Sequence, residues 1–177
     1  MAMTLITTNT SSNAASSVFN SGIDSTYKLY LFDFYNVNPA TDDDYFQFQA
    51  NATDTADYND MEITSSWFSG SMTEAGSQDV AYNTSHDLAG SASFQRLTPA
   101  LGSGADESCA GTLWLFNPSN TTYIKHFYAS IILYNSANKA EQVYVGGYFN
   151  DTTAIDDVQF KMSSGNMDSV IKMYGVG

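Results

Sequence analysis

Residues 27–37 read Tyr-Lys-Leu-Tyr-Leu-Phe-Asp-Phe-Tyr-Asn-Val, the strongest strand signal in the chain. Aromatic and β-branched residues favour extended backbone. The odd positions of this run are almost as apolar as its even positions, which include Tyr30, Phe32 and Phe34. A strand with one solvated face would instead alternate apolar and polar side chains. We therefore expect one face of the strand to meet a second sheet and the other to meet a covering segment or a neighbouring subunit.

Shorter runs of the same kind follow, separated by turn residues. Residues 45–50 alternate cleanly, which predicts Phe46 and Phe48 inward and Gln47 and Gln49 outward. No segment keeps a helical period over three turns. The regular succession of short aromatic strands separated by turn residues is typical of a β-sandwich. We predict an all-β fold, a two-sheet antiparallel β-sandwich that is jelly-roll-like. Further strands are expected near residues 62–68, 80–82, 92–101, 110–116, 122–134, 142–149, 156–162 and 168–175.

Two turns and one segment boundary complete this prediction. Asn117-Pro118 should stop a strand, because proline has no backbone donor. Ser164-Gly165-Asn166 should form the turn of a closing hairpin, with Gly165 at positive φ. Residues 1–17 are polar and are expected to form an extended arm that attaches the protein elsewhere, and residues 18–177 a single sandwich domain.

The charge balance excludes several classes of partner. The sequence contains six Lys and Arg residues and 19 Asp and Glu residues, which gives a formal net charge of −13. Nucleic-acid binding needs a basic patch, and anionic membrane surfaces repel an acidic protein. No apolar run is long enough to span a bilayer, and the first residues lack the basic start and apolar core of a secretory signal. We expect folding in a cytoplasm, without nucleic-acid or membrane partners.

Candidates for catalysis are isolated residues. His86 and His126 are far apart in sequence, and neither lies at a metal-ligand spacing. Cys109 precedes an apolar strand, where a buried thiol is expected. No nucleophile motif accompanies these residues. We predict a protein that is not an enzyme and has no catalytic or cofactor-binding residues.

Carboxylates cluster in three loops, which raises the question of a cation. Asp42, Asp43 and Asp44 form one group, Asp156 and Asp157 another, and Asp54, Asp57 and Asp60 a third with regular spacing. Calcium takes oxygen ligands from such loops, but the pattern of a calcium-binding loop is absent. We predict no metal site and assign these residues to solvated turns.

Aromatic side chains offer a second interpretation. A surface rich in tyrosine beside asparagine and serine is typical of adaptable recognition sites. An exposed set of these rings would form a platform for carbohydrate, although strand aromatics more often fill cores and interfaces. The residues concerned are Trp67, Trp114, Tyr123, Tyr128, Tyr134, Tyr144 and Tyr148.

Six short blocks occur in order along the chain: Ser21–Tyr27, Phe34–Asp42, Gly111–Pro118, Gly146–Tyr148, Phe160–Asn166 and Lys172–Gly175. Together they resemble small β-rich virion surface proteins of tailed, marine-type bacteriophages, which act as capsid decoration proteins or as tail-fibre terminal domains. The resemblance covers residue 16 to the C-terminus and supplies no catalytic residues.

The resemblance implies a non-enzymatic virion protein, assembled in the host cytoplasm. The short polar segment before the module favours a self-contained unit on the capsid or neck, and we expect a capsid decoration protein that contacts the major capsid protein. The two apolar faces of residues 27–37 favour assembly as a homotrimer. The alternative is a tail-fibre or receptor-binding tip that recognises host glycan. A hydrolase of surface polysaccharide is a third and weaker interpretation, because no site signature supports it.

Overall fold

The computed structural model describes residues 2–53, 57–135 and 137–177. Within these ranges the chain forms β-strands, and it forms no helix. This confirms the all-β class. The strands are β1 (Met3–Ala14), β2 (Ser17–Phe19), β3 (Leu29–Pro39), β4 (Phe46–Ala52), β5 (Ile63–Thr73), β6 (Gln78–Tyr82), β7 (Gln95–Arg96), β8 (Ser108–Phe116), β9 (Lys125–Asn135), β10 (Lys139–Phe149), β11 (Ile155–Met162) and β12 (Met167–Val176).

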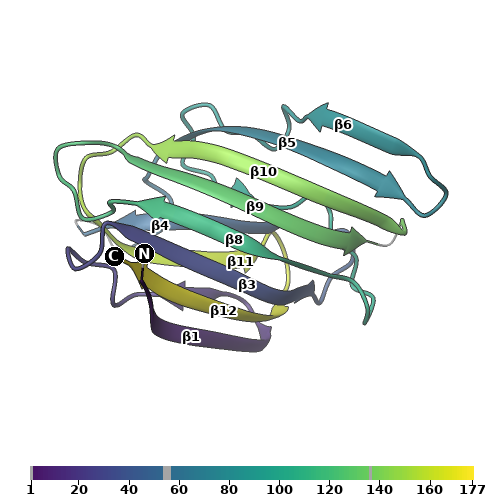
Figure 1. Ribbon diagram of the computed structural model, residues 1–177, viewed down its shortest axis with the longest axis horizontal. Helices are drawn as coiled ribbons and strands as arrows, with labels where there is room; N and C mark the ends of the chain where they lie inside the picture. The colour runs from purple at the N-terminus through teal and green to yellow at the C-terminus, as the bar shows by residue number, and fades with distance from the viewer. Residues whose placement is uncertain (1, 54–56, 136) are drawn as a thin grey trace.

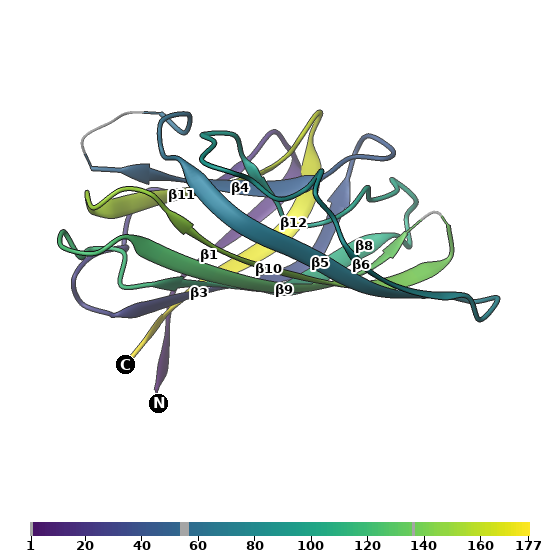
Figure 2. The same cartoon turned by 90° about the horizontal axis from the view of Figure 1, so that it is seen from above.

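The strands form two antiparallel sheets of unequal size that pack face to face (Figures 1 and 2). The large sheet has the order β1-β12-β3-β8-β9-β10-β5-β6, and the small sheet has the order β2-β11-β4-β7. The predicted two-sheet antiparallel sandwich is therefore confirmed.

The chain rolls from one sheet into the other at one end of the sandwich. Strands β1, β12 and β3 lie side by side in the large sheet, and their chain neighbours β2, β11 and β4 lie in the same order in the small sheet. Three antiparallel segments thus fold over together between the layers. This rolled ribbon is the jelly-roll-like feature of the fold.

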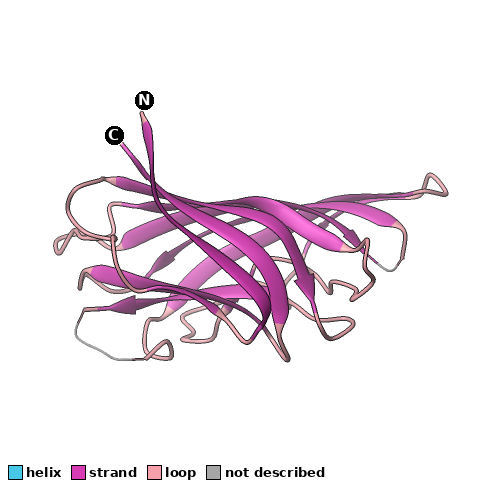
Figure 3. Cartoon of the chain, turned by 90° about the horizontal axis from the view of Figure 1, so that it is seen from below, coloured by secondary structure: helices cyan, strands magenta, loops and turns pink. Residues whose placement is uncertain are grey.

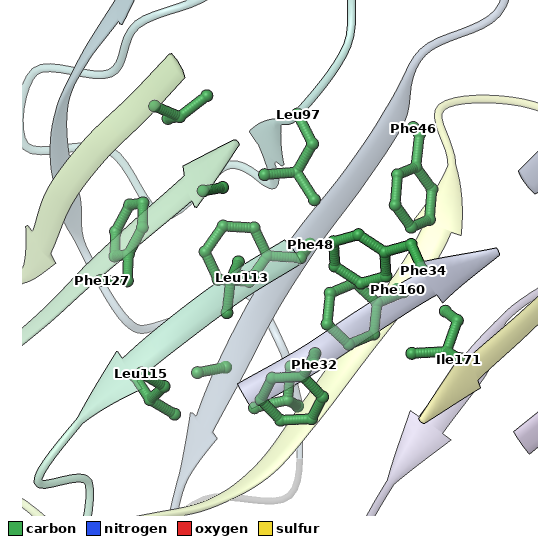
Figure 4. Close-up of a cluster of buried hydrophobic side chains, with 14 of the residues drawn as sticks. Phe32, Phe34, Phe46, Phe48, Leu97, Leu113, Leu115, Phe127, Phe160 and Ile171 are labelled. Carbon is green, nitrogen blue, oxygen red and sulfur yellow. The ribbon is translucent and has the colours of Figure 1, made fainter. Parts of the chain in front are cut away.

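Phenylalanine rings from both sheets fill the space between the layers (Figure 4). The Phe160 ring of β11 lies 5.1 Å from that of Phe34, 5.3 Å from that of Phe32 and 5.9 Å from that of Phe46, measured between centroids. Aromatic pairs of this geometry each add about 0.5–1.5 kcal/mol beyond the burial of their area. Phe160 of β11 thus links the two sheets, and β4 does the same through Phe46 and Phe48, whose rings contact those of Phe34, Phe127 and Phe149 in the large sheet.

A bulge in β3 changes which residues face the core. Asn36 has φ of +49°, and the pairing with β8 shifts register between Phe34 and Val37. The extra residue places Val37 on the same side as Phe34, and both are buried. The second apolar face of residues 27–37 is therefore narrower than the odd–even pattern predicts, and it centres on Leu31.

Strand β4 corrects a second expectation. Gln47 and Gln49 were predicted to face solvent, but both are buried, and so is every residue of the strand. The amide of Gln49 donates to the carbonyls of Met61, Ala92 and Ser93, at 3.1, 3.2 and 3.3 Å. Two loops therefore cover the outer side of the small sheet, and buried glutamine side chains satisfy their backbone acceptors.

The N-terminal segment is not the separate arm expected for residues 1–17. Residues 3–14 form β1, which pairs along its length with β12 at the edge of the large sheet. Ile6 packs against the core, and Ala2 and Gly177 exchange two backbone hydrogen bonds. The segment is extended and polar as predicted, but backbone pairing makes it part of the sandwich.

The closing hairpin is where the sequence predicts it. Strand β11 ends at Met162, β12 begins at Met167, and Gly165 has φ of +67°. Strand β8 likewise stops before Asn117, which has φ of +49°. The strand expected at 92–101 is reduced to the two residues of β7, because the flanking segments form the loops over the small sheet.

Candidate functional site

The outer face of the large sheet carries most of the exposed large apolar side chains among the described residues. The small sheet and its loops cover the other face, and in Figure 3 no described segment crosses the outer face, above which the chain ends project. Residues directly opposite each other on antiparallel strands share a face. The register of the eight strands therefore shows which side chains point outward here.

Every strand of the large sheet contributes large apolar or aromatic side chains to this face, beside polar ones, and we call the apolar and aromatic set the outer-face patch. It extends across all eight strands, from β1 at one edge to β6 at the other. Some members are markedly exposed, Val80 by 84% and Tyr82 by 57%. The members that are exposed are Leu5, Tyr35, Phe68, Met72, Val80, Tyr82, Phe116, Tyr128 and Ile132, and those that are partly buried include Trp114, Tyr134, Tyr144, Tyr148 and Tyr174.

One row of the patch crosses four strands. Tyr174 of β12 lies opposite Leu31 of β3, which lies opposite Trp114 of β8, which lies opposite Tyr128 of β9. Leu31 is only 4% exposed although it points outward, because its two large neighbours flank it. Gly146 continues the row on β10, and a Cβ atom added there would meet nothing within 4 Å. The row therefore ends in an open notch between large rings.

A second row lies toward the β6 edge. The rings of Phe68 and Tyr144 stack with centroids 5.4 Å apart, and Tyr82 lies opposite Phe68 on β6. Ile132 faces outward on β9 one pair further along. Phe68 and Tyr144 therefore fix each other's position at this end of the patch.

Charges on this face are few and tied to local partners. Asp33 and Lys172 lie opposite each other on β3 and β12. The Tyr35 hydroxyl donates to the Asp33 carboxylate, and this hydrogen bond raises the pKa of Tyr35 to about 12. The Lys172 Nζ atom lies 5.0 Å from the centroid of the Tyr35 ring. Most of the carboxylates of this acidic chain instead lie in loops and at the rim of the sandwich.

The structure divides the aromatic residues that were candidates for a carbohydrate platform. It brings Trp114, Tyr128, Tyr144 and Tyr148 together with Tyr134 on the outer face. Trp67, by contrast, is fully buried in the core, and Tyr123 lies in the loop before β9, 70% exposed. An exposed aromatic surface therefore exists, but its membership differs from the predicted one.

The aliphatic part of the patch was not predicted from the sequence. Met72, Val80 and Ile132 are among the exposed members, and Phe68 and Phe116 extend the aromatic part. The alternation within β9 carries the signal, since its even residues from His126 to Tyr134 all point outward. Reading that strand by period two would have found Ile132.

The two histidines and the cysteine lie in separate places. His126 is exposed on the outer face, with its ring 6.3 Å from that of Tyr148. His86 is buried between the rings of Trp67 and Tyr45, at 4.7 and 5.6 Å. Cys109 is buried, and burial raises the pKa of its thiol. The structure does not bring these three residues together.

Asp44 has a structural partner set of its own. It is buried, and its carboxylate accepts hydrogen bonds from the backbone amides of Tyr45 and Ser164 and from the hydroxyls of Ser163 and Ser164. It therefore joins the loop before β4 to the closing hairpin. Asp42 is exposed and accepts from the backbone amide of Ser103 at 3.1 Å.

The other carboxylate groups do not converge. Asp57 and Asp60 are exposed, Asp156 and Asp157 are half-buried, and Asp54 lies outside the described residues. Within the described ranges, no group of three or more His, Cys, Asp or Glu side chains has the arrangement of a metal site. In the same ranges, no helix has the length and apolarity to cross a membrane.

Comparison with known proteins adds no family. No protein-family model matches the chain, and no curated protein matches it.

Proposed function

We propose that the protein is a non-enzymatic structural module that assembles with copies of itself, as a homotrimer, through the outer-face patch. In this role it decorates the virion surface of a tailed bacteriophage and contacts the major capsid protein. The observation that carries the proposal is the outer face itself, a broad apolar surface without a cover among the described residues of its own chain. Contiguous apolar surfaces of this kind mark protein interfaces.

The charge distribution favours a second copy of the chain as the occupant. Two molecules of net charge −13 repel each other when their acidic loops approach. The outer face carries few charges, so it is where two equal copies can meet at the least electrostatic cost. A partner that is strongly basic would gain nothing from this face and would instead bind the acidic rim.

The geometry also suits self-association. The patch is held by strand pairing and ring contacts, so little side-chain freedom is lost when it is covered. Its rings are tyrosine, tryptophan and phenylalanine, the residue types enriched in the centres of interfaces. The virion location rests on the resemblance of the sequence blocks, most of which lie in or beside strands of the large sheet.

The oligomeric state of the purified protein tests this proposal. Light scattering at micromolar concentration should give three times the chain mass of 19.3 kDa. Gly146→Glu should reduce the mass to that of one chain, because it places a carboxylate in the middle of the patch. The added side chain has room in the monomer, where a Cβ atom at this position meets nothing within 4 Å.

Ala105→Glu is the matched control, since it adds the same charge in an exposed loop. It should leave the oligomer intact. A wild-type protein that is monomeric and fully soluble would contradict the proposal. Equal loss of assembly in both variants would show that net charge, rather than the outer face, controls association.

A further inference from the structure

The loops over the small sheet enclose a second surface feature, on the side of the sandwich away from the outer-face patch. It is a pocket of about 720 Å³ above β4 and β7. Its lining is mainly hydroxyl and amide side chains with two aromatic rings, and it contains one guanidinium group. Among the lining residues are Gln47, Tyr58, Ser85, Asp87, Phe94 and Arg96.

Arg96 is the one arginine of the sequence. Its guanidinium carbon lies 3.9 Å from the centroid of the Tyr45 ring, which fixes the group by a cation–π contact. One nitrogen donates to the carbonyl of Ser85 at 3.5 Å. Among the described residues, no carboxylate lies within ion-pair distance of Arg96. The ion pair observed in these ranges joins Lys139 to Glu141 of β10, at 3.0 Å, outside the pocket lining. A guanidinium has five N–H donors in a planar fork that fits a carboxylate.

An unpaired arginine is notable in a chain with 19 acidic residues. It lies in β7 opposite Gln47 of β4, and both residues line the pocket. Burial and the neighbouring Arg96 charge lower the pKa of His86, which also lines the pocket. The histidine is therefore neutral at pH 7, and Arg96 supplies the positive charge of the pocket lining.

Aromatic rings form one side of the pocket. Tyr58 and Phe94 have ring centroids 6.4 Å apart, and the Lys161 Nζ atom lies 4.6 Å from the centroid of Phe94. Burial, with the nearby carboxylates of Asp157 and Asp156, raises the pKa of Tyr58 to about 12. Its hydroxyl is therefore protonated and able to donate a hydrogen bond.

We infer that this pocket binds a saccharide ring that carries a carboxylate, a uronic-acid residue of a surface glycan. The carboxylate would accept paired hydrogen bonds from Arg96, the sugar face would lie on Phe94, and the lining hydroxyl and amide groups would bind the sugar hydroxyls. Aromatic rings with one polar edge suit ligands that are apolar on one face and hydroxylated at the rim. Asp87 also lines the pocket, and its carboxylate accepts from the Tyr82 hydroxyl at 2.7 Å. Its negative charge acts against an anionic ligand, so the paired hydrogen bonds to Arg96 must outweigh that repulsion.

The inference is independent of assembly through the outer-face patch. The pocket lies over the small sheet, so a molecule associated by its large sheet keeps the pocket open to solvent. Glycan binding and self-association can therefore occur in the same particle, and an experiment that contradicts one of the two proposals leaves the other intact.

Calorimetric titration of the full chain with three probes tests the site: methyl glucuronide, methyl glucoside and acetate. The glucuronide should bind at least about tenfold more tightly than either of the others, since hydrogen bonds to a charged group are worth about 1.5–3 kcal/mol. Arg96→Gln should abolish this preference. Lys28→Gln, which removes an exposed positive charge outside the pocket lining, should retain it.

Thermal unfolding shows whether Arg96→Gln still folds. If it does not, Phe94→Ala decides, because it removes the ring platform and leaves the guanidinium in place. Reduced glucuronide affinity in that variant supports the site, and unchanged affinity overturns it. Equal binding of glucuronide and glucoside, equal binding of glucuronide and acetate, or no glucuronide binding at about 1 mM would each overturn the inference.

Discussion

At the scale of single residues, polar side chains link parts of the chain that are distant in sequence. The Asp44 carboxylate accepts from Ser163 and Ser164, about 120 positions away, and the Gln49 amide serves three loop carbonyls. Lys125 is buried and donates to the carbonyls of Asp151 and Thr153. Each of these side chains makes hydrogen bonds to polar groups that would otherwise be buried without a hydrogen-bond partner. A buried polar group without a partner lowers the stability of the fold.

Gly165 is the residue whose conformation most restricts substitution in the closing hairpin. It has φ of +67°, and a Cβ atom there would lie 2.5 Å from the Thr41 Oγ1 atom. We expect Gly165→Val to lower the free energy of unfolding by about 1–3 kcal/mol, because a β-branched residue resists this φ and must also displace Thr41. Urea unfolding followed by tryptophan fluorescence measures the difference.

Gly146→Val is the control for that experiment. Gly146 lies on the outer face of β10 with ordinary strand backbone, and a Cβ atom added to it would have no neighbour within 4 Å. Valine should be tolerated there at no cost in stability, since it favours strands. If the two variants unfold at the same urea concentration, the hairpin does not depend on the conformation of Gly165.

At the scale of strands, sequence patterns were sufficient for most of the large sheet. Alternation and turn residues located the strands from β8 to β12 to within about three residues at each end, whereas β5 was expected to end at Phe68 and continues to Thr73. The pattern failed in β3 beyond Phe34, because the Asn36 bulge reverses inside and outside. It failed in β4 because loops from elsewhere in the chain cover Gln47 and Gln49. Both errors come from backbone geometry and tertiary covering, which a local pattern does not contain.

Strand β1 could not be recognised by hydrophobicity. Its sequence is mostly Thr, Ser and Asn, and backbone pairing to β12 rather than side-chain burial holds it in the sheet. The candidate sites show the same limit. The outer-face patch follows from alternation within strands, whereas the pocket depends on two loops and on Arg96 lying beside Tyr45.

Deleting residues 2–15 should destabilise the protein, contrary to the behaviour of a free arm. The deletion removes the edge strand that pairs with β12 and the contact of Ile6 with the core. It also leaves β12 as an unpaired edge, and such edges promote aggregation. We expect a lower urea midpoint and larger particles in size-exclusion chromatography. Ile6→Ser, which keeps the strand pairing, should lower the urea midpoint less than the deletion does. A deletion variant as stable as the wild type would show that β1 does not contribute to the stability of the fold.

At the scale of the whole molecule, the two faces differ in chemistry. The outer face of the large sheet is apolar and poor in charge, whereas the loops and rim hold most of the 19 acidic residues. Copies that meet through the outer face bury apolar surface, and their acidic rims remain in solvent. The rims still repel each other at a distance, so repulsion limits how tightly the copies associate.

This balance predicts that salt strengthens self-association. Between about 0.01 M and about 1 M NaCl the Debye length falls from about 30 Å to about 3 Å, which screens the repulsion between the acidic rims. Apolar burial is not weakened by this screening, so the dissociation constant should fall by roughly tenfold, a gain of about 1.4 kcal/mol. Sedimentation equilibrium at a series of salt concentrations measures it. Gly146→Glu should remain monomeric throughout, because its defect is local to the patch. An interface built from ion pairs would respond in the opposite direction, and a dissociation constant that rises with salt would therefore exclude the outer-face patch as the contact surface.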